Sequence, residues 1–240
     1  MGCRVKYSKE PLPENGVSPL SDPTEVQHIP NMYLQRPRYG QMIYLDHPED
    51  AHALRRRVIS DKLVDKKQSG NGNPLRIGII QRTRSRVITN LDEIVTALQD
   101  KLENCVITIS ELKEAPLLRQ QAEWFATKDV IIAVHGAALA NAIFVTPGTI
   151  ILQLYPPNFF WQSLDPLIEQ SGGIALDWYD RKEDPIVAWR NAQAQKMQVV
   201  DKAREGNVTP PIDQIIDPIL LSLGAKLATM VDMNNVRFTP

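Results

Sequence analysis

The chain has 240 residues, of which 43% are hydrophobic and 23% charged, proportions that are ordinary for a globular protein. A formal net charge of −1 gives no reason to expect nucleic acid or an anionic membrane as a partner, and no apolar run is long enough to span a bilayer. The two cysteines, Cys3 and Cys105, argue against a disulfide framework and leave the redox compartment undecided.

The N-terminal part of the chain is rich in proline. Six prolines block any long helix in residues 1–45, which are predicted to be irregular. A helix is expected to begin at Asp46 or Pro48 and to run to Leu63, because apolar residues recur there at helical spacing. Residues 66–74 combine Gly, Asn and Pro and are predicted to form a loop.

From Leu75 onward, short apolar runs alternate with helical patterns of about ten residues, which predicts βαβ units and an α/β fold with a parallel sheet. The predicted strands are residues 75–80, 106–109, 129–134, 149–155 and a short edge strand, 174–178. The predicted helices are residues 91–102, 117–126, 137–144, 161–170, 186–205 and one within 211–231.

A histidine turn follows the strand that ends at Val134. His135 and Gly136 lead into a helix of small residues that begins with Ala137 and Ala138, so backbone N–H groups are left at the start of this helix. Their direction and the helix dipole are suited to an anion such as a diphosphate. His135 adds a ring nitrogen at the carboxyl end of the strand, where ligands bind in open α/β sheets. The alternative is a histidine satisfied by a backbone carbonyl at the sheet edge.

Three arginines, Arg82, Arg84 and Arg86, follow the first predicted strand. A planar guanidinium can hold a diphosphate through two parallel hydrogen bonds, which a lysine cannot do. A loop of solvated basic side chains is the alternative interpretation.

Two further polar residues are candidate contacts of a nucleotide. Asn141 lies in the apolar helix, where its amide needs a partner: a ribose, a backbone loop or the preceding turn. Glu111 follows the second predicted strand and is in a position to accept from a ribose hydroxyl, although such a residue often only faces solvent.

Four segments together resemble glycosyltransferase family 61, whose characteristic pattern is a strand, HGAGLTN, an apolar run, a Pro-Gly turn and another strand. The corresponding segments are His135–Tyr155 with its Pro147-Gly148 turn, Gln81–Glu93, Gln121–Phe125 and Gly172–Tyr179. They keep the family's order and spacing over roughly residues 75–180. Arg82 and Arg86 match the family's arginine positions. The second Gly and the Thr of HGAGLTN are replaced by Ala138 and Ala140.

The resemblance implies the C-terminal, Rossmann-like half of a two-domain GT-B glycosyltransferase, which binds the nucleotide-sugar. Residues 1–74 are then the end or remnant of an N-terminal acceptor domain, and residues 75–240 form the donor domain with C-terminal helices. On this interpretation the chain is either truncated or has lost its acceptor half. A location in the Golgi or ER lumen is implied if an N-terminal anchor is missing, and a cytoplasmic location otherwise.

The expected activity is inverting transfer of a hexose, a pentose or N-acetylglucosamine from a nucleotide-sugar, most simply UDP-linked, to a glycan or protein hydroxyl. His135 is the fallback candidate for the general base. The expected donor contacts are Arg82, Arg86, Glu111, His135, Gly136, Ala137, Ala138 and Asn141.

No metal or other cofactor is implied, because no DxD pair follows a strand. The missing GxGxxG fingerprint argues against an NAD-dependent enzyme. The alternative function is a non-catalytic nucleotide-sugar-binding or scaffolding remnant, which the two alanine replacements favour.

Overall fold

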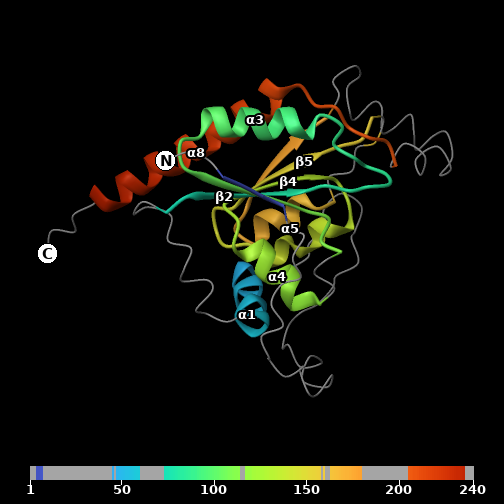
Figure 1. The fold of residues 1–240 in the computed structure, drawn as a ribbon. Coiled ribbons are helices and arrows are strands. Elements are labelled where there is room, and N and C mark those ends of the chain that lie inside the picture. Colours follow the sequence, from blue (N-terminus) through green and yellow to red (C-terminus); the bar gives the residue numbers. More distant parts are fainter. Residues whose placement is uncertain are drawn as a thin grey trace, which may run out of the picture.

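In the described part of the chain, a parallel six-stranded sheet lies between two layers of helices (Figure 1). The computed structural model describes residues 4–7, 45, 47–59, 73–113, 117–157, 159, 163–179 and 205–235. The strands are β1 (Arg4–Tyr7), β2 (Leu75–Ile80), β3 (Cys105–Ser110), β4 (Val130–Val134), β5 (Ile150–Leu154) and β6 (Ile174–Trp178). Their order across the sheet is β1-β3-β2-β4-β5-β6, and every neighbouring pair is parallel.

The strand order places a topological switch point between β2 and β4. From β2 the chain first adds β3 on one side and then adds β4 on the other side, followed by β5 and β6. The connections leaving β2 and β4 therefore diverge at the carboxyl ends of these strands. In doubly wound sheets of this order, ligands bind in the crevice at this point.

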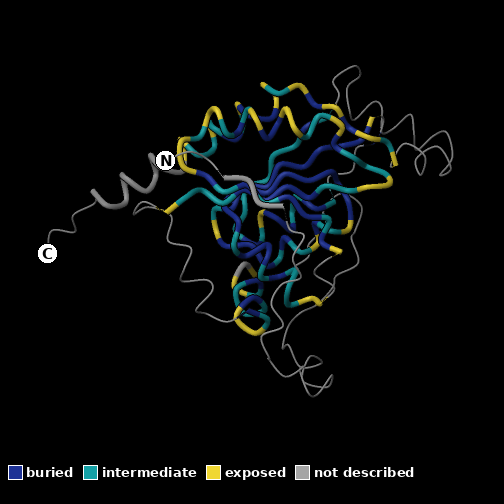
Figure 2. Tube along the Cα trace, viewed as in Figure 1, coloured by how far each residue is buried: buried dark blue, intermediate teal, exposed yellow. Residues whose placement is uncertain are grey.

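The helices are α1 (Pro48–Val58), α3 (Leu91–Lys101), α4 (Leu118–Ala126), the 3-10 helix η3 (Ala137–Phe144), α5 (Asp165–Gln170) and α8 (Ile212–Asn235). Helices α3 and α8 cover one face of the sheet, and α1, α4, η3 and α5 lie on the other (Figure 1). Strands β4 and β5 at the centre are buried throughout, whereas most of β6 is half-buried (Figure 2). A strand alternates its side chains between the two faces, so Ile150 and Leu152 pack under α3 and α8 while Ile151 packs toward α4 and α5.

The predicted α/β class and the strands and helices between Leu75 and Trp178 are confirmed, with small shifts of their bounds. The predicted helix over 161–170 begins only at Asp165, with a proline in its first turn. The N-terminal helix begins at Pro48 and ends at Val58, because Ile59 is extended. The helix predicted over 186–205 and most of the loop predicted over 66–74 lie outside the described residues.

The prediction of an irregular N-terminus is wrong at one place. Residues Arg4–Tyr7 form β1, which pairs in parallel with β3 at the edge of the sheet. A four-residue strand that precedes a proline-rich segment has no local periodicity of its own, and its pairing partner lies about a hundred residues away.

Strand β3 begins with a cysteine that forms a disulfide. Cys105 is buried at the start of β3 and is disulfide-bonded, which the cysteine count alone does not predict. The chain's other cysteine, Cys3, lies outside the described residues.

Within the ranges that are described, no helix combines the length and apolarity needed to cross a membrane.

Helix α1 is fixed to the rest of the molecule by a buried arginine. The Arg55 guanidinium donates to the backbone carbonyl of Val145 at 2.6 Å and lies 2.9 Å from Nδ1 of His52. A guanidinium has only donors, so His52 Nδ1 must accept, and the imidazole must be neutral for this contact. Burial first, and then the charges of Arg55 and Arg56, lower the pKa of His52 from its ordinary value of 6.5.

Gly78 of β2 is expected to tolerate no side chain. A Cβ at this position would lie 2.6 Å from the Trp124 ring of α4. Gly78→Ala should therefore lower the free energy of unfolding by about 1–3 kcal/mol. Gly224→Ala is the matched control, because nothing lies within 4 Å of the new methyl group, and it should raise stability by about 0.5–1 kcal/mol. Chemical denaturation measures both changes, and an equal response of the two variants would contradict the packing seen here.

The His52 contact should make the stability of the protein depend on pH. Since the folded protein binds the His52 proton less readily than the unfolded chain does, the contribution is complete above pH 6.5 and is lost as the pH falls through the lowered pKa. The slope from one proton is at most about 1.4 kcal/mol per pH unit. Comparing denaturation of the wild type and His52→Gln between about pH 5 and 8 isolates this term. Parallel pH curves for the two proteins would show that His52 is not coupled to folding.

Candidate functional site

Two loops meet at the switch point. The first, residues 81–90, follows β2 and is called the arginine loop here. The second consists of His135 and Gly136 and leads from β4 into η3. Because β2 and β4 are paired in register, with Ile80 opposite Ala133, both loops leave the same edge of the sheet. The residues singled out in the sequence are thereby brought together, although about fifty positions separate them.

The arginine loop is closed at its base by one side chain. The Gln81 amide donates to the carbonyl of Ile88 and accepts from its N–H, both at 3.1 Å. These two bonds imitate a pair of strand hydrogen bonds and hold the ends of the loop together. The arginines lie between these ends.

A segment distant in the sequence, residues 205–210, braces the same loop. The Val208 carbonyl accepts from the N–H of Thr89, and the Val208 N–H donates to the Val87 carbonyl, each at 2.9 Å. The Asn90 amide also donates to the carbonyl of Pro210 at 2.8 Å. Asn90, which the sequence marks as a helix cap, makes no side-chain cap to α3. This brace gives the loop a fixed shape rather than the mobility of a surface loop.

Arg86 connects the two loops. Its Nη1 donates to the backbone carbonyl of His135 at 3.2 Å. Its backbone has a φ of 58°, in the left-handed region that costs a residue with a Cβ roughly 1 kcal/mol or more. Arg82 and Arg86 are both half-buried, whereas Arg84 is exposed. The structure thus separates the two arginines expected to bind an anion from the third.

Gly136 leaves space for the Arg86 guanidinium. A Cβ on Gly136 would lie 2.5 Å from Nη1 of Arg86 and 3.6 Å from Nη1 of Arg82. Its φ of 165° is extended and open to any residue. The absence of a side chain leaves room for the Arg86 guanidinium, while Nη1 of Arg82 lies at an ordinary contact distance.

Helix η3 starts beside these guanidinium groups. Its first hydrogen bond runs from the Leu139 N–H to the Gly136 carbonyl at 2.9 Å, so the N–H groups of Ala137 and Ala138 precede the helical ladder. Ala137 is exposed and Ala138 half-buried. The expected arrangement of cations next to the opening amides of a helix is present, although the helix is of the tighter 3-10 type.

The imidazole of His135 is buried, with 6% of the residue exposed. Nδ1 lies 3.2 Å from Oε1 of Gln153, so a side-chain amide contacts this nitrogen. The ring stacks on Tyr155 with a centroid distance of 4.9 Å. Phe159 lies 5.6 Å from the ring on the same measure. The imidazole is thus packed among Gln153, Tyr155 and Phe159, while the backbone carbonyl of His135 accepts from Arg86.

The imidazole of His135 contacts a polar cluster around Gln153 of β5, which was not predicted from the sequence. This carboxamide network comprises His135, Gln153, Tyr155, Asp165 and Asp177. Gln153 is fully buried, and its Nε2 donates to Asp165 and, at 3.2 Å, to Asp177. Tyr155 donates to Asp177, and burial together with the two carboxylates raises its pKa. The available signal was a glutamine in the middle of an otherwise apolar strand, since a buried amide needs partners.

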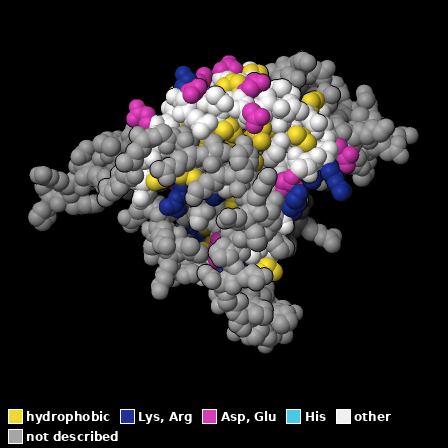
Figure 3. All heavy atoms as spheres, viewed as in Figure 1, with side chains coloured by type: hydrophobic (Ala, Val, Ile, Leu, Met, Phe, Trp, Pro, Cys, Tyr) yellow, Lys and Arg dark blue, Asp and Glu magenta, His cyan; other side chains and the backbone are white. Residues whose placement is uncertain are grey.

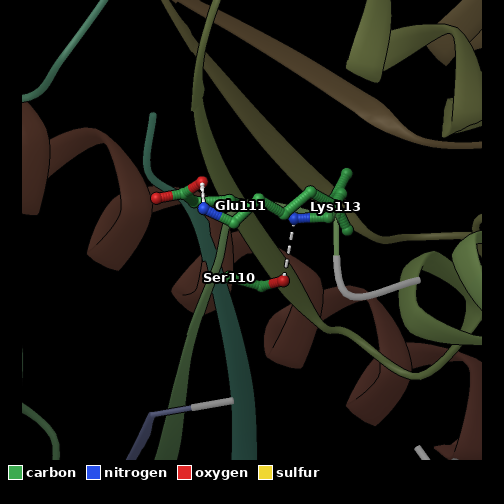
Figure 4. A network of polar contacts seen from close by, with 4 residues as sticks. Ser110, Glu111 and Lys113 are labelled. Carbon is green, nitrogen blue, oxygen red and sulfur yellow. Dashed lines mark hydrogen bonds and ion pairs between the residues drawn. The ribbon is translucent and has the colours of Figure 1, made fainter. Parts of the chain in front are cut away.

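Glu111 lies in the turn that follows β3, next to the strand that leads into the arginine loop (Figure 4). Its carboxylate pairs with Lys113 at 2.5 Å, and Ser110 Oγ accepts from the Leu112 N–H at 3.0 Å. Leu112, like Arg86, has a positive φ, here 61°. The turn is therefore locally tied, and its carboxylate already has a cationic partner.

Asn141 has partners within the protein. Its Nδ2 donates to Oε1 of Gln121 at 2.9 Å and to the carbonyl of Ala138 at 3.1 Å. The second bond is the contact with the preceding turn that was considered as an alternative. The side chain links η3 to α4, and its donors need no ribose.

Replacing Arg86 in two ways should reveal the cost of its backbone conformation. Arg86→Gly and Arg86→Ala both remove the guanidinium, but only glycine relieves the left-handed strain. We expect Arg86→Gly to be more stable than Arg86→Ala by about 0.5–1 kcal/mol in chemical denaturation. The reverse order would show that residue 86 does not hold a left-handed conformation in solution.

Comparison with known proteins places this site in a family. The glycosyltransferase 61 family model matches residues 28–152, more than half of the chain. Protein O-linked-mannose beta-1,4-N-acetylglucosaminyltransferase 2 of Tetraodon nigroviridis is 26% identical over 139 residues, 58% of this chain and 23% of that protein. Alpha-1,3-arabinosyltransferase XAT3 of rice (Oryza sativa subsp. japonica) is 31% identical over 90 residues, 38% of this chain and 15% of that protein.

A plant relative shows the same pattern of partial coverage. Xylan glycosyltransferase MUCI21 of Arabidopsis thaliana is 26% identical over 136 residues, 50% of this chain and 27% of that protein. The matched part thus spans between 15% and 27% of these three relatives. The family match covers α1 to η3 and the first residues of β5, and it includes the arginine loop and the histidine turn. The chain belongs to the glycosyltransferase 61 family.

Proposed function

We propose that this chain binds the diphosphate of a nucleotide-sugar, most simply a UDP-sugar, at the switch point and serves in glycosyl transfer to a hydroxyl group. The observation that carries the proposal is the position of the Arg86 guanidinium, held against Gly136 beside the first amides of η3. The parallel sheet is of the kind that forms the donor half of a two-domain GT-B enzyme. The names of the relatives, which include a beta-1,2-xylosyltransferase of rice, supply the sugar classes to consider: N-acetylglucosamine, arabinose and xylose.

The charges at this edge match a diphosphate. Arg82 and Arg86 bring two guanidinium groups to one glycine, and each can form paired hydrogen bonds to phosphate oxygens. The N–H groups of Ala137 and Ala138 add neutral donors at the positive end of a short helix. By contrast, acidic side chains gather over α3 and α8 (Figure 3), which makes that layer unfavourable for an anion.

The same groups account for the chemistry that a glycosyltransferase needs. In an inverting transfer, an acceptor oxygen attacks the anomeric carbon while the bond from this carbon to the diphosphate oxygen breaks. Arginines and amides can stabilise the charge that develops on the leaving diphosphate, a role that a metal ion has in other enzymes. The acceptor hydroxyl gives its proton to a general base, for which we propose His135.

Calorimetric titration with UDP tests the arginine contact. Arg86→Ala should weaken UDP binding at least about tenfold, since hydrogen bonds to charged groups contribute about 1.5–3 kcal/mol. Arg84→Ala is the matched control: its side chain is exposed and should matter little. Gly136→Ala keeps the guanidinium but crowds it, and it should weaken binding as well. Unchanged UDP affinity in Arg86→Ala would contradict the proposed role of the arginines in binding the diphosphate.

A turnover measurement distinguishes an enzyme from a non-catalytic binding module. The binding module is the alternative favoured by Ala138 and Ala140, which replace the Gly and Thr of the family pattern. Hydrolysis of UDP-N-acetylglucosamine, UDP-xylose and UDP-arabinose by the purified chain should exceed that by His135→Ala at least about tenfold. UDP binding without consumption of any of these donors would support the binding module.

A further inference from the structure

We propose that Gln153 is a positioning residue that holds His135 in the tautomer with its proton on Nδ1. In neutral imidazole the lone pair then lies on Nε2, which becomes the nitrogen able to accept a proton or a hydrogen bond from a substrate hydroxyl. This inference extends the proposed function, because it specifies how the histidine is prepared for that role. Its physical content, the tautomer, can be measured without any substrate.

The register of the sheet brings the participating residues together. Ala133 lies opposite Gln153 in the pairing of β4 with β5, and Gln153 lies opposite Asp177 in the pairing of β5 with β6. His135 follows Ala133 by two positions and so continues the same face of the sheet. Asp165 reaches this face from the start of α5. Three adjacent strands and one helix thus surround one fully buried amide.

The two carboxylates fix the orientation of the amide. Nε2 of Gln153 donates to both Asp165 and Asp177. Turning the amide over would place its carbonyl oxygen against two carboxylates, which offer no proton when ionised. Since buried polar groups that lose their partner cost about 1–3 kcal/mol, the observed orientation is strongly preferred. Oε1 of Gln153 must then face the imidazole.

The orientation of the amide determines the tautomer. Oε1 of Gln153 lies 3.2 Å from Nδ1 of His135 and can only accept a hydrogen bond. Nδ1 must therefore carry the proton. The stacked Tyr155 ring keeps the imidazole in its plane, and the hydroxyl of this tyrosine is bound to Asp177. The tyrosine thus ties the ring and the carboxylate to each other.

The arrangement differs from a direct histidine–carboxylate pair. The charged and titratable groups of the network are Asp165, Asp177 and Tyr155, and Arg86 binds the backbone carbonyl of His135 from the opposite loop. An amide stands between the imidazole and both acids. In hydrolase triads a carboxylate contacts the imidazole directly. Here the amide transmits the orienting effect of the two carboxylates to the ring.

Nitrogen-detected tautomer spectra of the full chain test the proposal. The chain has four histidines, and the signals of His135 are identified by their loss in His135→Gln. In protein labelled with ¹⁵N-histidine at roughly pH 8, where histidines are neutral, two-bond proton–nitrogen correlations distinguish the tautomers. We expect the Nδ1–H form in the wild type and a mixture of the two forms in Gln153→Leu. Ile151→Val, on the same strand and the same face, is the control and should keep the wild-type pattern.

The wild-type spectrum alone can overturn the proposal, even if Gln153→Leu does not fold: an Nε2–H form of His135 would do so. An unchanged tautomer in folded Gln153→Leu would do so as well. In the hydrolysis assay, Gln153→Leu should lower kcat at least about tenfold and leave the KM for the UDP-sugar within about twofold, since tautomer errors affect the chemical step. A wild type with the Nδ1–H form but no turnover would refute the proposed function and leave the tautomer assignment intact.

Discussion

The bond from Arg86 to the carbonyl of His135 joins the two halves of the site. It spans the switch point, where one loop leaves β2 and the other leaves β4. Residue 136 has no side chain that would crowd this guanidinium, and the Arg86 backbone adopts a left-handed conformation. A guanidinium that already donates to one carbonyl is oriented before any ligand arrives, so little conformational entropy is lost when the ligand binds.

The sheet edge where the loops meet also stores backbone strain. Among the described residues, Arg86 and Leu112 are the non-glycine residues with positive φ, and they follow the neighbouring strands β2 and β3. Such conformations persist only where surrounding contacts enforce them, and they are common at functional sites. Here the enforcing contacts are the brace from residues 205–210 on one loop and the Ser110 hydroxyl on the other.

The sequence predicts this fold as far as local patterns determine it. The buried strands and amphipathic helices between Leu75 and Trp178 have clear periods, and the glycine after β4 marks the loop correctly. Features that depend on partners far along the chain were not predictable: the edge strand β1, the brace and the disulfide at Cys105. Residue type and spacing single out Arg82 and Arg86, and the structure brings both near Gly136. The carboxamide network was missed, because Gln153 and Asp177 become neighbours only through strand register.

The brace has a consequence for how the protein is made. Residues 205–210 are synthesised about 120 positions after the loop that they hold. All strands of the sheet are translated before them, so a nascent chain can assemble its central layer while this loop still lacks its hydrogen-bonding partner. Contacts of such long sequence separation form late. The arginine loop would then reach its final shape last, once residues 205–210 have left the ribosome.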